Sequence, residues 1–106
     1  MRDDRGMKKG TYTMTEKVWL YPGETAQWHF VTLTKKIGQE IKELYGKSAR
    51  GFGSLPVEVN VGLTIWKTSI FPDKRVGSYI LPLKAMVRKK EDVEVGELLT
   101  FTIKIL

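Results

Sequence analysis

The sequence contains no cysteine. This excludes disulfide bonds, metal sites built on thiolates and a cysteine nucleophile, so thiol chemistry explains neither the fold nor the function. A chain without cysteine suits a reducing compartment, and we expect the protein to be cytoplasmic.

Histidine and long apolar runs are equally scarce. His29 is the only histidine, so the sequence offers no pair of imidazole ligands and no recognisable metal-binding spacing. We expect a structural or surface histidine, and neither a metal nor a cofactor. No apolar run approaches the roughly 18 residues of a membrane span, and the N-terminus lacks the apolar core of a signal peptide, so we expect no membrane association.

The excess positive charge is concentrated in one quarter of the chain. The net charge is +6. Residues 64 to 90 carry one acidic residue, Asp73, whereas basic and acidic residues balance elsewhere. A local positive field favours anionic partners such as nucleic acid, nucleotides or acidic protein surfaces; the alternative is that these side chains only face solvent. The basic residues of this quarter are Lys67, Lys74, Arg75, Lys84, Arg88, Lys89 and Lys90.

The length of 106 residues suits one domain. Residues 1 to 13 are polar and lack periodicity, so we expect a disordered leader followed by a single domain over residues 14 to 106. In that domain, apolar and polar residues alternate in short runs, a pattern typical of strands with one buried face. Strands are predicted over residues 14–20, 27–33, 54–61, 63–71, 78–81 and 98–106. The residues expected to face the core are clearest in two of them: Val57, Val59 and Val61, and Leu99, Phe101, Ile103 and Ile105.

Two short helices are predicted between the strands. The first begins after Thr34, whose hydroxyl can cap it, and stops at Gly46. Gly38 inside this helix costs about 1 kcal/mol relative to alanine, so either the helix is short or a neighbouring segment approaches closely there. The second is expected to begin at Pro82, because proline cannot donate to a sheet but suits a first helical turn. The apolar stripes are Ile37, Ile41, Leu44 and Tyr45 in the first helix, and Leu83, Met86 and Val87 in the second.

The predicted order of elements is β-β-α-β-β-β-α-β. Each helix follows a short step, Leu33-Thr34 in the first half and Leu81-Pro82 in the second, which indicates two pseudo-duplicated β-α-β units. Short strands with two small helices indicate a mostly-β fold, a barrel whose ends the helices cover.

Four ordered blocks form a recognisable signature: WHFV (28–31), RGFGSLPV (50–57), WKTSIFP (66–72) and YILPLKAMVR (79–88). With them the chain resembles the DUF1905 family of small bacterial proteins over residues ~14 to 106, the size of a single domain. The resemblance implies a double-split β-barrel, similar in hairpin layout to the swapped-hairpin bacterial transition-state regulators and antitoxins, but built from one chain. The sequence departs from the family pattern at Thr34, where proline is usual, and at Glu97, where aspartate is usual. The family has no established activity, so the resemblance implies a fold rather than a function.

The candidate binding residues are cationic or polar. Lys67 and Ser69 are two positions apart on a predicted strand and therefore share one face. Trp66 lies on the opposite face and is predicted to belong to the core, so these three side chains cannot line one pocket. We predict a cationic, ligand-binding face formed by Arg50, Lys67, Ser69, Lys84 and Arg88.

Two other interpretations apply to these positions. A lysine beside a serine can activate a nucleophile, but the sequence shows no oxyanion hole or nucleophile elbow for Lys67 and Ser69. The segment Arg50-Gly51-Phe52-Gly53 either presents bare amides to an anion or forms a tight turn.

We therefore expect a small, monomeric, non-enzymatic binding module that uses the cationic face for an anionic small molecule or nucleic acid. The alternative is a protein-interaction domain, normally fused to or paired with another module, whose charges only keep it in solution. A third hypothesis, a hydrolase using Lys67 and Ser69, requires a cavity beside Ser69.

Overall fold

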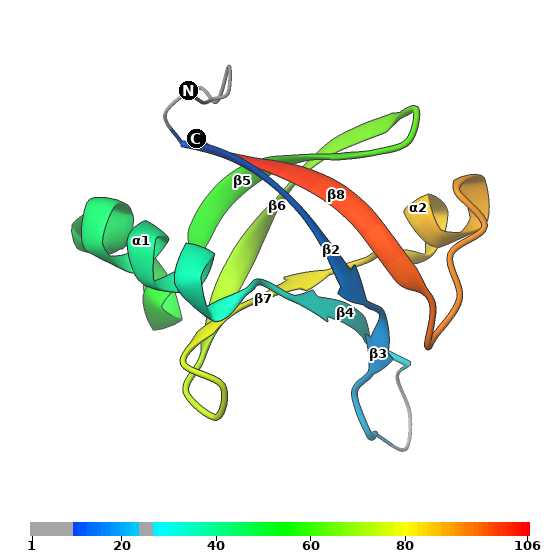
Figure 1. Ribbon diagram of the computed structural model, residues 1–106, viewed down its shortest axis with the longest axis horizontal. Helices are drawn as coiled ribbons and strands as arrows, with labels where there is room; N and C mark the ends of the chain where they lie inside the picture. The colour runs from blue at the N-terminus through cyan, green and yellow to red at the C-terminus, as the bar shows by residue number, and fades with distance from the viewer. Residues whose placement is uncertain (1–9, 24–26) are drawn as a thin grey trace.

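The computed structural model describes residues 10–23 and 27–106, and its main feature is one strongly curled sheet of seven antiparallel strands (Figure 1). The strand order in the sheet is β2-β8-β5-β6-β7-β4-β3. The strands are β2 (Thr11–Lys17), β3 (Trp19–Leu20), β4 (His29–Thr32), β5 (Leu55–Val61), β6 (Thr64–Asp73), β7 (Ser78–Pro82) and β8 (Leu98–Ile105). The helices are α1 (Lys35–Tyr45) and α2 (Ala85–Lys90), with short 3-10 turns η1 (Gly46–Ser48) and η2 (Gly51–Gly53).

Two segments change partners along their length, and this makes the barrel split. The first part of β6 pairs with β5, from Thr64 to Ile70, and its last three residues pair with β7 instead. In the same way β2 pairs with β8, and β3, one residue further along the chain, pairs with β4. Val18 between them still bonds the β8 side, through Glu97 and Gly96. The predicted mostly-β split barrel with two short helices is therefore confirmed.

The two halves of the chain are related by an approximate two-fold axis. In the ladder between β4 and β7, Val31 faces Leu81 at the centre. Reciprocal bonds flank it, from the Leu33 amide to the Tyr79 carbonyl and from the Leu83 amide to the His29 carbonyl, both 2.9 Å. Each residue thus corresponds to the one fifty positions later, as Leu33 does to Leu83. The predicted pseudo-duplication is confirmed, but α2 follows Leu83-Lys84 rather than Leu81-Pro82.

Pro82 was wrongly predicted to open the second helix. It is the last residue of β7 and lies opposite Phe30, and Lys84 is the residue that precedes α2. The alternation along β7 explains this placement. Tyr79 and Leu83 are the residues that bond the β4 side, so the Pro82 nitrogen points to the other edge, where no ladder bond is made.

The N-terminal boundary of the domain also lies earlier than predicted. Thr11, Tyr12 and Thr13 belong to β2 and pair with β8 as far as Lys104, so the expected leader is wrong for these residues. The rest of that prediction, residues 1 to 9, lies outside the described residues. Within the described part of the chain, neither helix has the length and apolar character that a membrane span requires.

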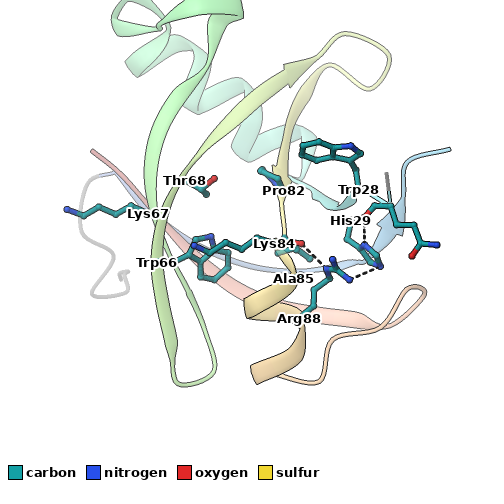
Figure 2. Close-up of a pocket in the computed structure, with 11 residues that line it drawn as sticks. Trp28, His29, Trp66, Lys67, Thr68, Pro82, Lys84, Ala85 and Arg88 are labelled. Carbon is teal, nitrogen blue, oxygen red and sulfur yellow. Dashed lines mark hydrogen bonds between the residues drawn. The ribbon is translucent and has the colours of Figure 1, made fainter. Parts of the chain in front are cut away.

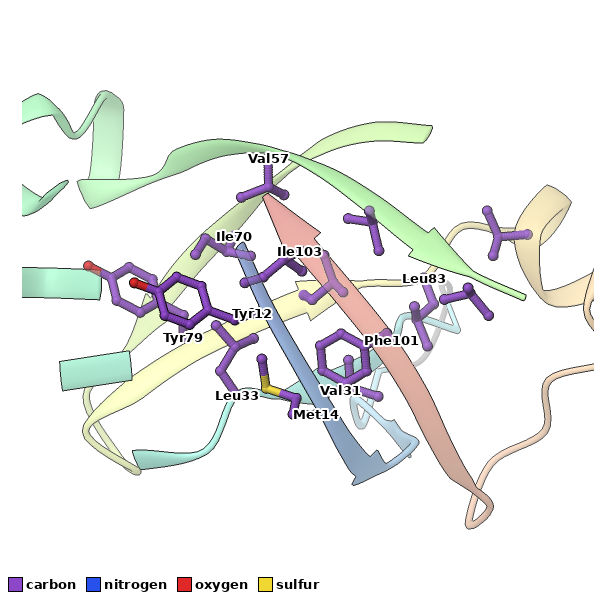
Figure 3. Close-up of a cluster of buried hydrophobic side chains, with 14 of the residues drawn as sticks. Tyr12, Met14, Val31, Leu33, Val57, Ile70, Tyr79, Leu83, Phe101 and Ile103 are labelled. Atoms are coloured by element: carbon purple, nitrogen blue, oxygen red, sulfur yellow. The ribbon is translucent and has the colours of Figure 1, made fainter. Parts of the chain in front are cut away.

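The core fills the inside of the curl and follows the strand alternation (Figure 3). Val57, Val59 and Val61 are buried as predicted. In β8, Phe101 and Ile103 are buried, and their neighbours Leu99 and Ile105 are half-buried against the same cluster. Burying such side chains supplies most of the free energy that folds the chain.

Helix α1 packs very closely against β7. Thr34 caps it as predicted, its hydroxyl accepting from the Ile37 amide at 3.3 Å. A Cβ added at Gly38 would lie only 3.0 Å from the Cα of Ser78. The Ser78 hydroxyl donates to the Leu33 carbonyl, 2.9 Å away, which ties the strand to the start of the helix. Gly38 is therefore present because a neighbour approaches, the second of the two explanations offered by the sequence.

Candidate functional site

A cavity of about 390 Å³ lies where β6 and β7 diverge. The two strands pair only from Phe71 onward, and beyond Ile80 the strand β7 turns away toward α2. The space left between them is closed on one side by α2 and on the other by the start of β4 (Figure 2). Its volume falls within the range of small-ligand pockets. It is lined by Gln27, Trp28, His29, Trp66, Lys67, Thr68, Pro82, Leu83, Lys84, Ala85 and Arg88.

Arg88 is held in the wall of this cavity by two contacts. Its Nε donates to the Leu83 carbonyl at 3.0 Å, and its Nη1 lies 3.5 Å from Nε2 of His29 (Figure 2). The other ring nitrogen of His29, Nδ1, is 3.0 Å from the Gln27 carbonyl. Since a carbonyl only accepts, Nδ1 carries the proton and Nε2 is the acceptor that faces the guanidinium. The histidine thus has a structural role, orienting the arginine, whose remaining N–H groups are left for a ligand.

The two-fold axis supplies an internal comparison for this arrangement. Gly38 of α1 corresponds to Arg88 of α2, and Ser78 corresponds to Trp28. At the α1 end the glycine lets the helix sit against Ser78, whose hydroxyl bonds the Leu33 carbonyl. At the α2 end the equivalent carbonyl, that of Leu83, is bonded by the arginine instead. The same framework is thus tightly packed at one end and opened around a guanidinium at the other.

The cavity is cationic. None of the described residues that line it is acidic, and within the described part of the chain no carboxylate pairs with Arg88. The one ion pair among those residues joins Arg75 and Asp73 at 2.8 Å, in the turn between β6 and β7. Hydrogen bonds from Arg75 lower the pKa of Asp73, so that carboxylate is already satisfied where it stands.

Aromatic rings complete the lining. Trp66 is buried, as its place on the inner face of β6 predicts, yet one side of it borders the cavity. Trp28 is exposed and stacks on Phe30, with ring centroids 6.4 Å apart and planes 13° from parallel. The pocket therefore offers flat apolar surface beside two cations, Lys84 and Arg88.

The structure brings together only part of the predicted cationic face. Lys84 and Arg88 line the cavity together. Lys67 also lines it, but its side chain points away from the other labelled residues, so its main chain forms the wall (Figure 2). Ser69 is half-buried and lines neither this cavity nor the groove described below, so a Lys67–Ser69 pair has no adjoining space for a substrate. Arg50 lies elsewhere, on the loop between α1 and β5.

The loop that contains Arg50 forms a tight turn. The Gly53 amide donates to the Arg50 carbonyl at 2.9 Å, and the Ser54 amide donates to the Gly51 carbonyl at 3.2 Å. Those two amides are therefore occupied within the turn and are not bare donors for an anion, which favours the turn interpretation. Phe52, in the middle of the turn, has a left-handed backbone with φ 60° and is 96% exposed.

A wider groove of about 840 Å³ lies beside this loop, between α1 and the β6–β7 hairpin. Phe52, Pro72 and Tyr79 supply most of its apolar surface, and Lys42 and Lys74 lie on its walls. Burial raises the pKa of Tyr79, which keeps its phenol protonated. Neither Lys84 nor Arg88 reaches this groove, so the two hollows are separate.

Sequence reasoning missed the contribution of β4 to the cavity. Gln27, Trp28 and His29 face Arg88 only because β4 and β7 pair antiparallel, a contact between segments about fifty residues apart. The signal that could have found them is the internal duplication, which aligns residues 27–29 with 77–79. The described residues contain no group of three histidines or carboxylates that could hold a metal ion.

Comparisons with known proteins bear on the family alone. No curated protein matches the chain. The model of a family described as a domain of unknown function, DUF1905, matches residues 15–103. That match covers almost every strand of the barrel and both helices, and it agrees with the four sequence blocks noted above. The chain therefore belongs to the DUF1905 family.

Proposed function

We propose that this domain is a non-enzymatic binding module that takes an anionic ligand in the cavity between β6 and β7. Arg88 is the anchor, Lys84 adds a second positive charge at the mouth, and Trp28 and Trp66 contact the apolar part of the ligand. The observation that carries the proposal is a half-buried guanidinium, oriented by His29 and Leu83, that has no carboxylate partner among the described residues.

The physical reason is the cost of removing a charge from water. A half-buried arginine loses part of its hydration and regains that free energy only when an anion or several acceptors replace the water. Carboxylates and phosphates accept from a guanidinium through short, charge-assisted hydrogen bonds. Because the guanidinium is already held in place, a ligand does not have to immobilise it on binding.

The test is a two-dimensional NMR titration of the labelled protein with acetate, inorganic phosphate, a nucleoside monophosphate, and short DNA and RNA at two salt concentrations. We expect shifts at His29, Lys84 and Arg88. Arg88→Ala should weaken binding by about 10- to 100-fold, the value of a hydrogen bond to a charged group. Lys89→Ala is the matched control, because it removes a positive charge from the same helix but does not line the cavity.

Equal losses in the two variants would contradict the proposal, because they would mean that only the general positive field matters. Nucleic acid would be indicated if oligonucleotides bound far more tightly than the monophosphate and with affinity falling steeply with salt. Thermal unfolding of each variant should accompany the titration, since Arg88 also bonds the Leu83 carbonyl.

A further inference from the structure

One edge of β6 carries backbone groups without a partner among the described residues. In β5, the Pro56 carbonyl accepts from Leu106 on the β8 side, so the residues of β5 on either side of Pro56 are the ones that bond β6. The β6 residues that receive those bonds are Thr64, Trp66, Thr68 and Ile70. The residues between them, Ile65, Lys67 and Ser69, consequently direct their N–H and C=O groups toward the opposite edge.

That opposite edge faces the split between the strands. The strand β7 pairs with β6 only over Phe71–Asp73, so it leaves Lys67 and Ser69 uncovered. From the other wall Pro82 faces β6, and it has no N–H to offer. Lys67 is the edge residue that lines the cavity, which places a free backbone donor and a free backbone acceptor in the same space as Arg88.

This combination narrows the chemistry of the ligand. A phosphate or a nucleic-acid backbone supplies acceptors only, and would leave the Lys67 carbonyl unsatisfied. An extended peptide supplies a donor and an acceptor from a single residue, at the spacing that an edge strand requires. The cationic wall then calls for a negative group on that peptide, and alternate side chains of the added strand would reach the tryptophans.

Building on the anion site proposed above, we infer that the ligand is an extended peptide that carries a carboxylate and adds as a short strand to the open edge of β6. One peptide residue pairs with Lys67 through two backbone hydrogen bonds. The carboxylate, from the C-terminus or from an acidic side chain, binds Arg88 and Lys84. The site thus combines strand addition with capture of a carboxylate.

The free protein gives the first test. Amide hydrogen exchange should be fast at Lys67 and Ser69, which have no bond to β5, and slow at Trp66 and Thr68, which do. Dilution of the sample should not change this pattern. If protection at Lys67 instead grows with protein concentration, a second copy of the chain covers the edge, and the peptide assignment is overturned.

The second test uses a short peptide of alternating threonine and valine with a free C-terminal carboxylate. At saturation we expect exchange at Lys67 to slow by on the order of tenfold or more. The same peptide with an amidated C-terminus should bind about 10- to 100-fold more weakly, and a version ending in glutamate amide tests the side-chain source of the carboxylate. Arg88→Gln should remove the preference for carboxylate over amide, whereas Lys89→Gln should preserve it.

The outcomes separate this inference from the broader one. Shifts at Arg88 with phosphate or acetate, but no peptide-induced protection at Lys67, would leave the anion site standing and overturn strand addition. No binding by small anions or by any of the peptides would overturn both. A peptide in which the residue opposite Lys67 is N-methylated should lose affinity, and unchanged affinity would also contradict the pairing.

Discussion

Replacing Gly38 by alanine should destabilise the protein, although alanine is the better helix former. The added Cβ would lie 2.8 Å from the Ser78 Cβ and 3.0 Å from its Cα, and a backbone atom cannot rotate away. Overpacking of this kind costs about 1–3 kcal/mol, and displacing the Ser78 hydroxyl from its bond to Leu33 adds about 1 kcal/mol. Against this, alanine gains about 1 kcal/mol in helix propensity. We therefore expect a net loss of about 2 kcal/mol.

Urea unfolding followed by circular dichroism measures this loss, and thermal unfolding should show a Tm about 10 °C lower. Gly46→Ala is the matched control, because Gly46 has a helical φ of −56° and its added Cβ would meet only Lys42 Cγ at an ordinary 3.6 Å. That variant should gain up to about 1 kcal/mol.

Combining Gly38→Ala with Ser78→Gly should recover part of the loss, because the second change removes the side chain in the way. The reasoning is refuted if Gly38→Ala is as stable as the original protein, or if the double variant shows simple additivity.

Three further perturbations test other parts of the molecule. Phe52→Asn should raise the free energy of unfolding by about 0.5–1 kcal/mol, since asparagine tolerates the left-handed backbone at φ 60°; a loss would show that the exposed ring packs on the groove. Gly62→Ala should cost about 2 kcal/mol, because φ is +55° and the added Cβ would lie 3.0 Å from Glu91 Cδ; in urea unfolding it should fall well below Gly51→Ala, which meets nothing within 4 Å. Burial, followed by the hydrogen bond to Glu40, raises the pKa of Tyr12 above its ordinary 10.0, so the folded state holds the phenolic proton more tightly and stability should fall as pH rises above about 10. In urea titrations across that range Tyr12→Phe should flatten the decline, and an unchanged slope would contradict this assignment.

Strand positions were predictable where one face of a strand is buried. The alternation of Val57, Val59 and Val61 follows directly from a core on one side, and the pattern in β8 does the same. Pro82 shows the limit of this reasoning. Whether proline is tolerated depends on which edge of the strand lacks a partner, and that is a property of the assembled sheet rather than of the local sequence.

The candidate site could be predicted only as a charge distribution. The local excess of lysine and arginine singled out Lys84 and Arg88, which share the cavity. It also included Lys67, whose side chain leaves on the other face of β6, and residues such as Arg50 that the fold places elsewhere. Periodicity states which side chains share a face of one element. It does not state which faces meet, and for this reason the partnership of His29 with Arg88 was invisible.

The pairing of β2 with β8 has a consequence for how the chain folds. The hydroxyls of Thr13 and Thr102 meet at 2.7 Å although 89 residues separate them along the sequence. The hairpins β5–β6 and β6–β7 are local and can form early, whereas the β2–β8 ladder must wait for the loss of chain entropy of a very long loop. We expect folding in milliseconds to seconds, with a late species in which the outer edge of β5 is uncovered and open to association with other chains. Substitutions in the β2–β8 ladder should then act mainly on the rate of unfolding and hardly on the rate of folding.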